Sequence, residues 1–438
     1  MMVYTHITEL IGNTPLLRLD PGVHGLADVD LYAKLESHNP FGSVKDRVAW
    51  AMIRDDLERV TAGGQSFIEA SSGNTAKALR VLGALHGIPL RAVTNRIRVS
   101  EVRELLHLLG TEIVELPGLS ECPDPHAADD VSAIIDQTIS QAPGRWYHPS
   151  QYTNERNIAA HHDGTGAEIA ADLAAAGIGD LDYLIGGLGT TGSTRGTATA
   201  LLAHHPGLRT VGVVSDRFDF IPGIRSEREM WDVGLFRPDF YDEIVTVDSA
   251  AAIEATLDLV RGYGVLAGPT SGAGYHAALR ALAAAPRPED RALVAVLIVC
   301  DRIEPYLSYF AKRRPDLFGK ATGPAPPTPG DTAPTLSPAA LAELDRTGRP
   351  TVVDTRGAMA YRVGHVPGAL NIRDDQLDEM LTQGVPFPRS RPVVFVCPVG
   401  ETSLRFAALA HGAGYDAFGL AGGIVAWRDA GYPLERGG

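Results

Sequence analysis

Cysteine is scarce in this chain. Only Cys122, Cys300 and Cys397 occur among 438 residues. Three thiols so far apart exclude a disulfide framework and the paired ligands of a structural zinc site, so we expect no metal. Cys122, in a loop of prolines and acids, and Cys300, at the end of an apolar run, are predicted to be structural. A chain with so few thiols is suited to the reducing cytoplasm, where we expect it to reside.

Positive charge and long apolar runs are also missing. The chain has 39 Lys and Arg against 53 Asp and Glu, a net charge of −14. This balance gives no electrostatic basis for binding nucleic acid. The apolar stretches, such as residues 292–300, are much shorter than the roughly 20 residues that cross a bilayer. The N-terminus shows no basic segment followed by an apolar core, so we expect no signal peptide. We expect no membrane partner either. The expected partner is a small-molecule substrate.

Short apolar runs alternate with amphipathic segments between about residues 31 and 310. This alternation predicts an α/β fold with mostly parallel sheets. Residues 321–336, rich in proline, predict an extended linker between a domain of residues 1–320 and a smaller α/β domain of residues 337–438. The expected strands are residues 31–35, 66–69, 90–94, 112–115, 183–186, 210–214, 293–300, 351–354 and 393–397, and the expected helices include residues 44–60, 101–110, 341–346 and 403–411.

Lys45 lies at a predicted loop-to-helix boundary, with Ser43 as the expected N-cap. In the first helical turn the helix dipole disfavours the protonated amine, which suits a lysine that forms a Schiff base. A lone lysine is more often a solvated surface residue. Three further loops, at residues 69–75, 186–193 and 268–274, open helices with glycines and hydroxyls, a pattern typical of anion sites. Together, these four segments favour the catalytic interpretation of the lysine.

The four segments resemble those of the cysteine synthases, which are fold-type II enzymes dependent on pyridoxal 5′-phosphate (PLP). The matching motifs are Ile11-Gly-Asn-Thr-Pro-Leu16, Asn39-Pro40 with Ser43-Val-Lys45, Ser72-Gly-Asn-Thr75, Gly187-Leu-Gly-Thr-Thr-Gly192 and Ser271-Gly272. The resemblance covers residues 3–315. It implies a fold of two α/β subdomains, like that of the tryptophan synthase β-subunit, and a homodimer.

The resemblance also implies a role for each matching residue. Lys45 would hold the cofactor as the internal aldimine and later move the α-proton, while Asn74 would bond the 3′-oxygen and Ser271 would face the pyridine nitrogen. The phosphate would be held by Gly189, Thr190, Thr191, Gly192 and Ser193, and the substrate carboxylate by Ser71, Ser72, Thr75 and Gln151. A serine opposite the ring nitrogen favours β-elimination to an aminoacrylate, to which a nucleophile then adds.

Within the family the chain is most similar to the O-phosphoserine sulfhydrylases. The similarity rests on the glycine-rich loop, on Gly164-Thr-Gly-Ala-Glu168, and on Ile224-Arg-Ser-Glu-Arg-Glu-Met230 before Leu235-Phe-Arg-Pro-Asp239. It implies that Arg225 receives the phosphate of the substrate, since a guanidinium matches a phosphate in charge and geometry. A surface ion pair with Glu227 or Glu229 is the alternative.

The chain departs from the family pattern at Ala76-Lys77 and at residues 94–98. The extra charges of Lys77, Arg96 and Arg98 either favour an anionic second substrate or a carrier-protein tail, or are solvated residues at helix ends. The solvated interpretation is preferred.

Residues 337–435 resemble a single-domain rhodanese. The matching segments are Val353-Asp-Thr-Arg356, Gly364-His-Val-Pro-Gly-Ala-Leu-Asn-Ile372, Val394-Phe-Val-Cys397 and Leu420-Ala-Gly-Gly-Ile-Val-Ala-Trp427. Cys397 would carry a persulfide, its pKa lowered by loop N–H groups and a helix N-terminus, and Asp354 and Arg356 are expected to brace the loop. Pro398, Glu401 and Thr402 stand where thiosulfate-using rhodaneses place basic residues. A protein persulfide or a small persulfide is therefore the expected sulfur donor.

Together the two domains imply β-replacement on O-phosphoserine or O-acetylserine to give L-cysteine. Sulfur would come from the Cys397 persulfide, directly or through a carrier protein with a thiocarboxylate. Amine addition, giving a 2,3-diaminopropionate derivative, and a cysteine β-lyase that passes sulfur to Cys397 remain alternatives. A non-catalytic sulfur relay is a third, which the intact Lys45, Asn74 and Ser271 disfavour.

Overall fold

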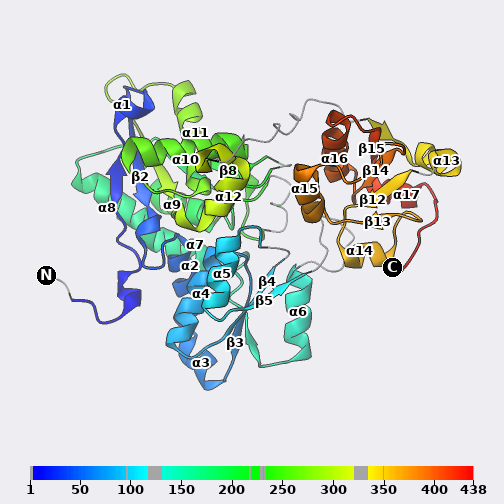
Figure 1. Cartoon of the computed structure of the whole chain (residues 1–438). Helices are drawn as coiled ribbons and strands as arrows, with labels where there is room; N and C mark the ends of the chain where they lie inside the picture. Colours follow the sequence, from blue (N-terminus) through cyan, green and yellow to red (C-terminus); the bar gives the residue numbers. More distant parts are fainter. Residues whose placement is uncertain are drawn as a thin grey trace. The chain divides into compact units, whose positions relative to one another are not determined.

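The computed structural model describes residues 3–94, 97–116, 131–216, 219–226, 230, 233–319, 334–348 and 350–437 (Figure 1). The chain divides into two compact units. The first consists of residues 1–114 and 135–314, and the second of residues 115–134 and 315–438. No helix within these described ranges is long and apolar enough to cross a membrane.

A six-stranded sheet with the order β1-β2-β10-β7-β8-β9 organises the first unit. All neighbouring strands are parallel except β1, which pairs antiparallel with β2. Every residue of the central strand β10 is buried, as expected of a parallel strand covered on both faces. The strands are β1 (Leu16–Arg18), β2 (Val29–Leu35), β7 (Tyr183–Gly187), β8 (Arg209–Ser215), β9 (Glu243–Val247) and β10 (Leu293–Val299).

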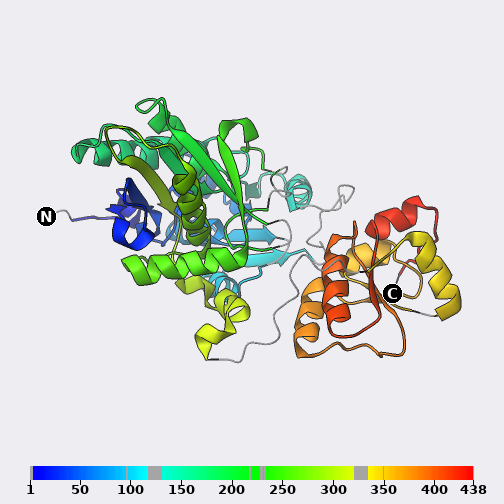
Figure 2. The ribbon, with the colours of Figure 1, turned by 90° about the horizontal axis from the view of Figure 1, so that it is seen from above.

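Helices cover both faces of this sheet (Figures 1 and 2). On one face, α10 (Ser249–Tyr263) and α11 (Pro269–Ala284) pack on a core that includes Leu31 and Leu297. On the other, α8 (Ala167–Ala175) and α9 (Gly192–Leu202) pack against Leu184 and Val296. Because β2, β7 and β10 run parallel, the loops that follow them meet at one edge of the sheet, where ligands bind in such folds. The α/β prediction is confirmed.

A smaller sheet, β5-β4-β3-β6, carries the other part of the predicted site. Its strands are β3 (Ser66–Ala70), β4 (Leu90–Thr94), β5 (Glu112–Glu115) and β6 (Trp146–Tyr147). A core with Phe67 and Leu79 joins it to α2 (Lys45–Ile53), α3 (Leu57–Ala62) and α4 (Asn74–Leu85). Two further helices follow, α5 (Ser100–Leu108) and α6 (Val131–Gln141).

The single helix predicted over residues 44–60 is wrong, because a turn separates α2 from α3. Asp56 lies in this turn, and its carboxylate accepts hydrogen bonds from Arg59, Tyr147 and Arg156 at 2.8–2.9 Å. The side chain of Asp56 thus makes hydrogen bonds that compete with a continuous helix at this position, which favours the turn between α2 and α3. The remaining short helices are α1 (Pro21–His24), α7 (Arg156–Ala160), α12 (Leu307–Arg313), a π-helix at His161–Gly166, and 3₁₀ turns at Ile7–Leu10, Glu36–His38, Pro238–Phe240, Glu304–Tyr306 and Pro315–Phe318.

The second unit contains a five-stranded parallel sheet, β11-β15-β14-β12-β13. Separate apolar cores on its two faces include Trp427 and Phe406. Most of the predicted linker 321–336 lies outside the described residues, but Thr335–Leu336 form β11 beside β15, so structure begins before residue 337. The other elements are β12 (Thr351–Asp354), β13 (Leu370–Asn371), β14 (Val393–Val396), β15 (Ala417–Leu420), α13 (Pro338–Gly348), α14 (Ala358–Val363), α15 (Asp374–Gln383), α16 (Glu401–Gly412) and α17 (Gly423–Asp429). The domain bounds stay a prediction.

Candidate active sites

Lys45 is the first residue of α2. The N-cap is Val44 rather than the predicted Ser43, yet the Ser43 hydroxyl accepts a hydrogen bond from the Lys45 N–H (3.2 Å). The Val44 N–H donates to the Cys300 carbonyl (2.8 Å), which ties the loop to the end of β10. Burial lowers the pKa of the Lys45 amine, and the charges of Cys300 and Asp301 oppose this effect only in part. A lowered pKa favours the neutral amine, the form that a Schiff-base lysine uses.

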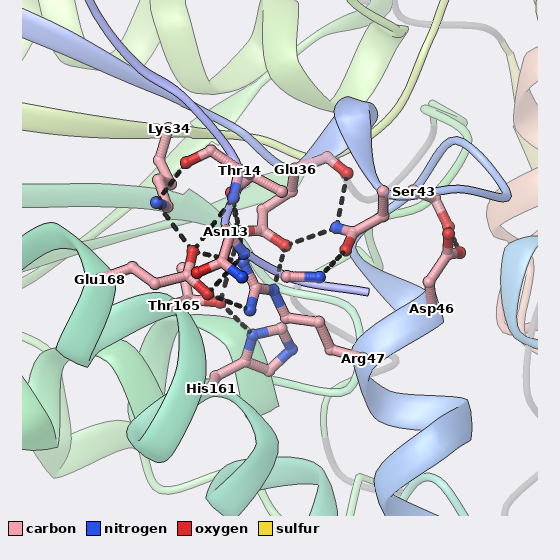
Figure 3. Close-up of polar contacts among 12 residues, drawn as sticks. Asn13, Thr14, Lys34, Glu36, Ser43, Asp46, Arg47, His161, Thr165 and Glu168 are labelled. Atoms are coloured by element: carbon pink, nitrogen blue, oxygen red, sulfur yellow. Dashed lines mark hydrogen bonds and ion pairs between the residues drawn. The ribbon is translucent and has the colours of Figure 1, made fainter. Parts of the chain in front are cut away.

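A buried polar network anchors α2 two residues beyond the lysine (Figure 3). The Arg47 guanidinium pairs with Glu36 (Nε–Oε2, 2.7 Å) and with Glu168 (Nη1–Oε1, 2.6 Å). The Glu168 carboxylate also pairs with the fully buried Lys34 (2.9 Å). Burial alone would raise the pKa of Glu168, but the hydrogen bonds and charge of Arg47 outweigh it and hold this pKa at about 2.

Two glycines make room for the Arg47 guanidinium. A Cβ at either Gly12 or Gly164 would lie 2.8 Å from Arg47 Nη1, too close for any other residue without displacing it. These glycines belong to the motifs at residues 11–16 and 164–168, which are distant from Lys45 in sequence. The sequence analysis identified both motifs but did not predict that both contact Arg47, which lies two residues after Lys45.

The predicted carboxylate-binding residues lie close together near the C-terminal end of β3. The Thr75 hydroxyl donates to Gln151 Oε1 (2.6 Å), and Gln151 Nε2 donates to the Ala70 carbonyl (2.6 Å). Ser71 Oγ accepts the Ala76 N–H (3.1 Å), which fixes the loop at the start of α4. Ser72 is exposed in the same loop.

Asn74, at the first position of α4, contacts two residues that the sequence analysis did not select. Its side-chain nitrogen donates to Asp301 Oδ2 (2.6 Å) and lies 3.3 Å from the Tyr306 hydroxyl, which itself donates to Asp301. Asp301 directly follows the Cys300 that ends the β10 run, which is the only signal the sequence offered.

The glycine-rich loop after β7 forms a turn at the start of α9. Thr191 is its N-cap with a positive φ of 67°. Asn157 Nδ2 donates to Thr190 Oγ1 (2.9 Å), while Thr191 Oγ1 is buried with no hydrogen-bond partner among the described residues. A buried hydroxyl without a partner, at a helix N-terminus, fits a phosphate. Gly189, Gly192 and Ser193 lie in the same turn.

Ser271 lies fully buried in the first turn of α11. Its Oγ accepts the backbone N–H of Cys300 (2.9 Å), so the hydroxyl hydrogen remains free to donate. A donor at this position fits an unprotonated pyridine nitrogen, as expected. Cys300 itself is buried, and burial raises the pKa of its thiol to about 12, consistent with a structural role. Cys122 lies outside the described residues.

Arg225 lies beside two of the predicted binding segments. Its guanidinium carbon is 4.7 Å from the centre of the Tyr152 ring, next in sequence to Gln151. Its backbone N–H donates to the Leu188 carbonyl (2.9 Å), next to the glycine-rich turn. The alternative partners, Glu227 and Glu229, lie outside the described residues.

Lys77 is not fully solvated, in contrast to the preferred interpretation of the sequence. It is half-buried on α4, and burial lowers its pKa while the charges of Asp46 and Asp301 oppose this. Arg98 is exposed, with its guanidinium 4.4 Å from the centre of the Phe220 ring. Arg96 lies outside the described residues.

Cys397 begins the loop between β14 and α16 in the second unit. Its buried thiol donates to the Ser403 hydroxyl oxygen (3.5 Å), whose own hydrogen goes to the Gly400 carbonyl, and its sulfur accepts the Gly400 N–H (3.1 Å). Hydrogen bonds donated to the sulfur stabilise its anion. Pro398 and Thr402 are also buried; the side chain of Glu401 lies outside the described set.

Asp354 and Arg356 form a buried ion pair (2.6 Å), and Arg356 also donates to the Gly364 carbonyl (2.7 Å). With its donors engaged in this way, Arg356 connects the end of β12 to the end of α14. The arrangement agrees with a bracing role.

Comparison with known proteins agrees with this geometry. Residues 7–301 match the pyridoxal-phosphate dependent enzyme family. The chain belongs to this family. Residues 337–430 match the rhodanese-like domain. The chain is 31% identical over 306 residues to cysteine synthase B of Pseudomonas aeruginosa (70% of this chain, 96% of the relative). It is 30% identical over 320 residues to O-ureido-L-serine synthase of Streptomyces lavendulae (71% and 93%).

Solved structures give the same picture. The chain is similar to a cysteine synthase from Entamoeba histolytica (TM-score 0.60, 26% identity, 74% of this chain and 93% of that one). It is also similar to an O-ureido-L-serine synthase (TM-score 0.60, 27% identity, 74% and 98%). The cofactor of this chain is PLP, as in the family to which it belongs. Lys45 fits PLP through an amine of lowered pKa, Thr191 through a buried hydroxyl without a partner among the described residues, and Ser271 through a hydroxyl that can still donate. When bound, it supplies an electron sink for the carbon that loses a proton.

Proposed function

We propose that the first unit replaces the β-substituent of an O-activated L-serine, O-phosphoserine or O-acetylserine, to form L-cysteine. The observation that carries this proposal is the Ser271 hydroxyl, which accepts the Cys300 N–H and so keeps its own hydrogen available to donate to a ring nitrogen. An unprotonated ring is a weaker electron sink, which favours rapid loss of the β-substituent. The cysteine synthase relatives support the same reaction class.

The proposal assigns each role to a side chain described above. The amine of Lys45 removes the α-proton. Thr75 and Gln151, joined by a hydrogen bond, bind the carboxylate together with Ser71 and Ser72. Arg225, next to Tyr152, binds the phosphate of O-phosphoserine.

The second unit is proposed to supply the sulfur. The Gly400 N–H donates a hydrogen bond to the sulfur of Cys397, and such a donor would stabilise a persulfide anion. From there the outer sulfur passes to the first unit or to the activated C-terminal carboxylate of a carrier protein. Either transfer leaves a disulfide to Cys397, and we propose that a thiol reductant cleaves it to release cysteine or the carrier thiocarboxylate. We further propose a cytoplasmic homodimer.

Product analysis tests the proposal. The purified holoenzyme receives O-phosphoserine or O-acetylserine, with sulfide or with a persulfide donor, and the products are identified by mass spectrometry. We expect cysteine from O-phosphoserine, and a fall of about 10²-fold in kcat/KM for that ester in Arg225→Met, because a bidentate charge pair is lost. O-Acetylserine should be nearly indifferent to Arg225→Met. Absence of cysteine with both esters would overturn the proposal.

A second candidate is a synthase with another nucleophile. One relative is named O-ureido-L-serine synthase, so similarity to this chain does not guarantee that sulfur is added. Supplying ammonia or hydroxyurea with O-phosphoserine or O-acetylserine, in the same mass-spectrometric assay, decides between the candidates. A 2,3-diaminopropionate or O-ureidoserine product formed faster than cysteine would favour the second. Release of sulfur from added cysteine would indicate a β-lyase.

A further inference from the structure

We infer that Asp301 is a positioning residue: its buried carboxylate fixes the Asn74 side-chain amide so that an N–H, and not the carbonyl, faces the 3′-oxygen of the cofactor. The inference rests on the proposed role of Asn74 and adds the residue that makes this role work.

The geometry of the contact carries the argument. Asp301 Oδ2 accepts from Asn74 Nδ2 (2.6 Å) and from the Tyr306 hydroxyl. A carboxylate can only accept, so it selects the amide nitrogen of Asn74 and repels the amide oxygen. Asn74 Nδ2 also donates to the Tyr306 hydroxyl (3.3 Å), which lies only 2.5 Å from the same Asp301 oxygen. Both acceptors therefore lie on the side of one amide hydrogen, and the other amide hydrogen is directed away from them, towards a ligand.

Burial makes the arrangement costly unless it has a function. Asp301 is only 3% exposed, and its Oδ1 has no hydrogen-bond partner among the described residues. A Cβ at Gly268 would lie 2.1 Å from this Oδ1, so a glycine backbone packs closely against the carboxylate. A buried acceptor left without a partner destabilises a fold and calls for an explanation.

Titratable groups face Asp301 from several elements. Lys45 comes from α2 and Lys77 from α4, while Cys300 precedes it and Tyr306 follows in the next 3₁₀ turn. Burial raises the pKa of Asp301, and the hydrogen bonds from Tyr306 and Asn74 and the charges of the two lysines counter this. Lys77 lies three positions after Asn74 on the same face of α4. The positive charge of Lys77 works against the rise in the pKa of Asp301 and so favours the ionised form, which is the form that selects the amide nitrogen.

The test uses the absorbance of the bound cofactor. An N–H donated to the 3′-oxygen stabilises that oxygen as an anion, which keeps the proton on the nitrogen contributed by Lys45 and gives the visible band. Without the donor the proton moves to the oxygen and a near-ultraviolet band grows. In holoenzyme Asp301→Asn, the ratio of visible to near-ultraviolet absorbance at neutral pH should fall about tenfold, as for loss of a hydrogen bond to a charged oxygen.

Asp46→Asn is the matched control. Asp46 is also a buried carboxylate near Lys77, but it bonds the Phe41 N–H and the Ser43 hydroxyl and makes no bond to Asn74. Its band ratio should stay within about twofold of wild type.

A double-mutant cycle shows whether Asp301 acts through Asn74. In the Asn74→Ala background, Asp301→Asn should change the ratio by less than about twofold. An equal change in both backgrounds, or no change in either, overturns the inference. Should Asp301→Asn fail to fold, Tyr306→Phe removes one bond to the same carboxylate oxygen and should lower the ratio about threefold; an unchanged ratio would likewise overturn it. None of these spectra requires an activated serine, so they stand apart from the test of the proposed function.

Discussion

The two units hold their reactive side chains by opposite means. The Cys397 thiol accepts a hydrogen bond from Gly400 and donates one to Ser403, three and six residues along the chain. In the first unit, Asn74 and Asp301 are 227 positions apart, and Arg47 and Glu168 are 121 apart. One site is thus local and the other is assembled by the fold. We therefore expect a mutation that disturbs long-range packing to impair the site of the first unit more than the loop of Cys397.

The largest expected effect separates the two chemistries themselves. Lys45→Ala should lower cysteine formation from free sulfide by about 10³-fold or more, because the residue that moves the proton is lost. Persulfide formation on Cys397 should survive in this variant. Cys397→Ser should do the reverse, losing persulfide formation and keeping turnover with sulfide. Activity with sulfide and labelling of the persulfide, measured on both variants, check this; joint loss in either variant would show that the units are not chemically separate.

Arg47→Met should next distinguish the assembled site from the local one. It leaves Glu36 buried without its ion-pair partner and removes one of the two partners of Glu168, at a cost of about 3–5 kcal/mol to the first unit. Hydrogen–deuterium exchange, resolved by peptide, should show lost protection in the first unit and little change around Cys397. Arg18→Met is the matched control, since Arg18 is half-exposed and pairs with Asp30 at the surface. There we expect a cost below about 1 kcal/mol.

The same network predicts how pH acts on the first unit. The pKa of Glu168 is held at about 2, below its ordinary 4.5, so its ionised form stabilises the folded state. This stabilisation is present above about pH 4.5 and is lost as the pH falls towards 2, a difference of up to about 3 kcal/mol. Unfolding free energies of wild type and Glu168→Gln across this range test it. A wild-type curve parallel to that of the variant would mean that Glu168 does not carry the effect.

Sequence reasoning identified the short loops that open helices but missed most of the contacts that the fold assembles, although Thr75 and Gln151, predicted to act together, are in contact. The loop of Cys397 and the turn at Thr191 follow from short patterns of glycine, hydroxyl and helix start. The fold class followed equally well from alternating apolar runs. The partnership of Arg47 with Glu168, the burial of Lys77 and the contact of Asp301 with Asn74 depend on which strands become neighbours. No short pattern encodes that, and so Lys77 was interpreted as solvated.

The smallest expected effect tests the local site through one glycine. Gly400 has a φ of +93°, and a Cβ there would lie 2.8 Å from the Gly422 backbone nitrogen. Gly400→Ala should therefore destabilise the second unit by about 2 kcal/mol and impair persulfide formation on Cys397, because the N–H that its sulfur accepts is displaced. Gly431→Ala is the control: its φ is +80° and nothing lies within 4 Å, so only the backbone cost of about 1 kcal/mol remains. Equal losses of persulfide formation in the two variants would mean that backbone strain alone, and not the position of the Gly400 N–H, governs the sulfur.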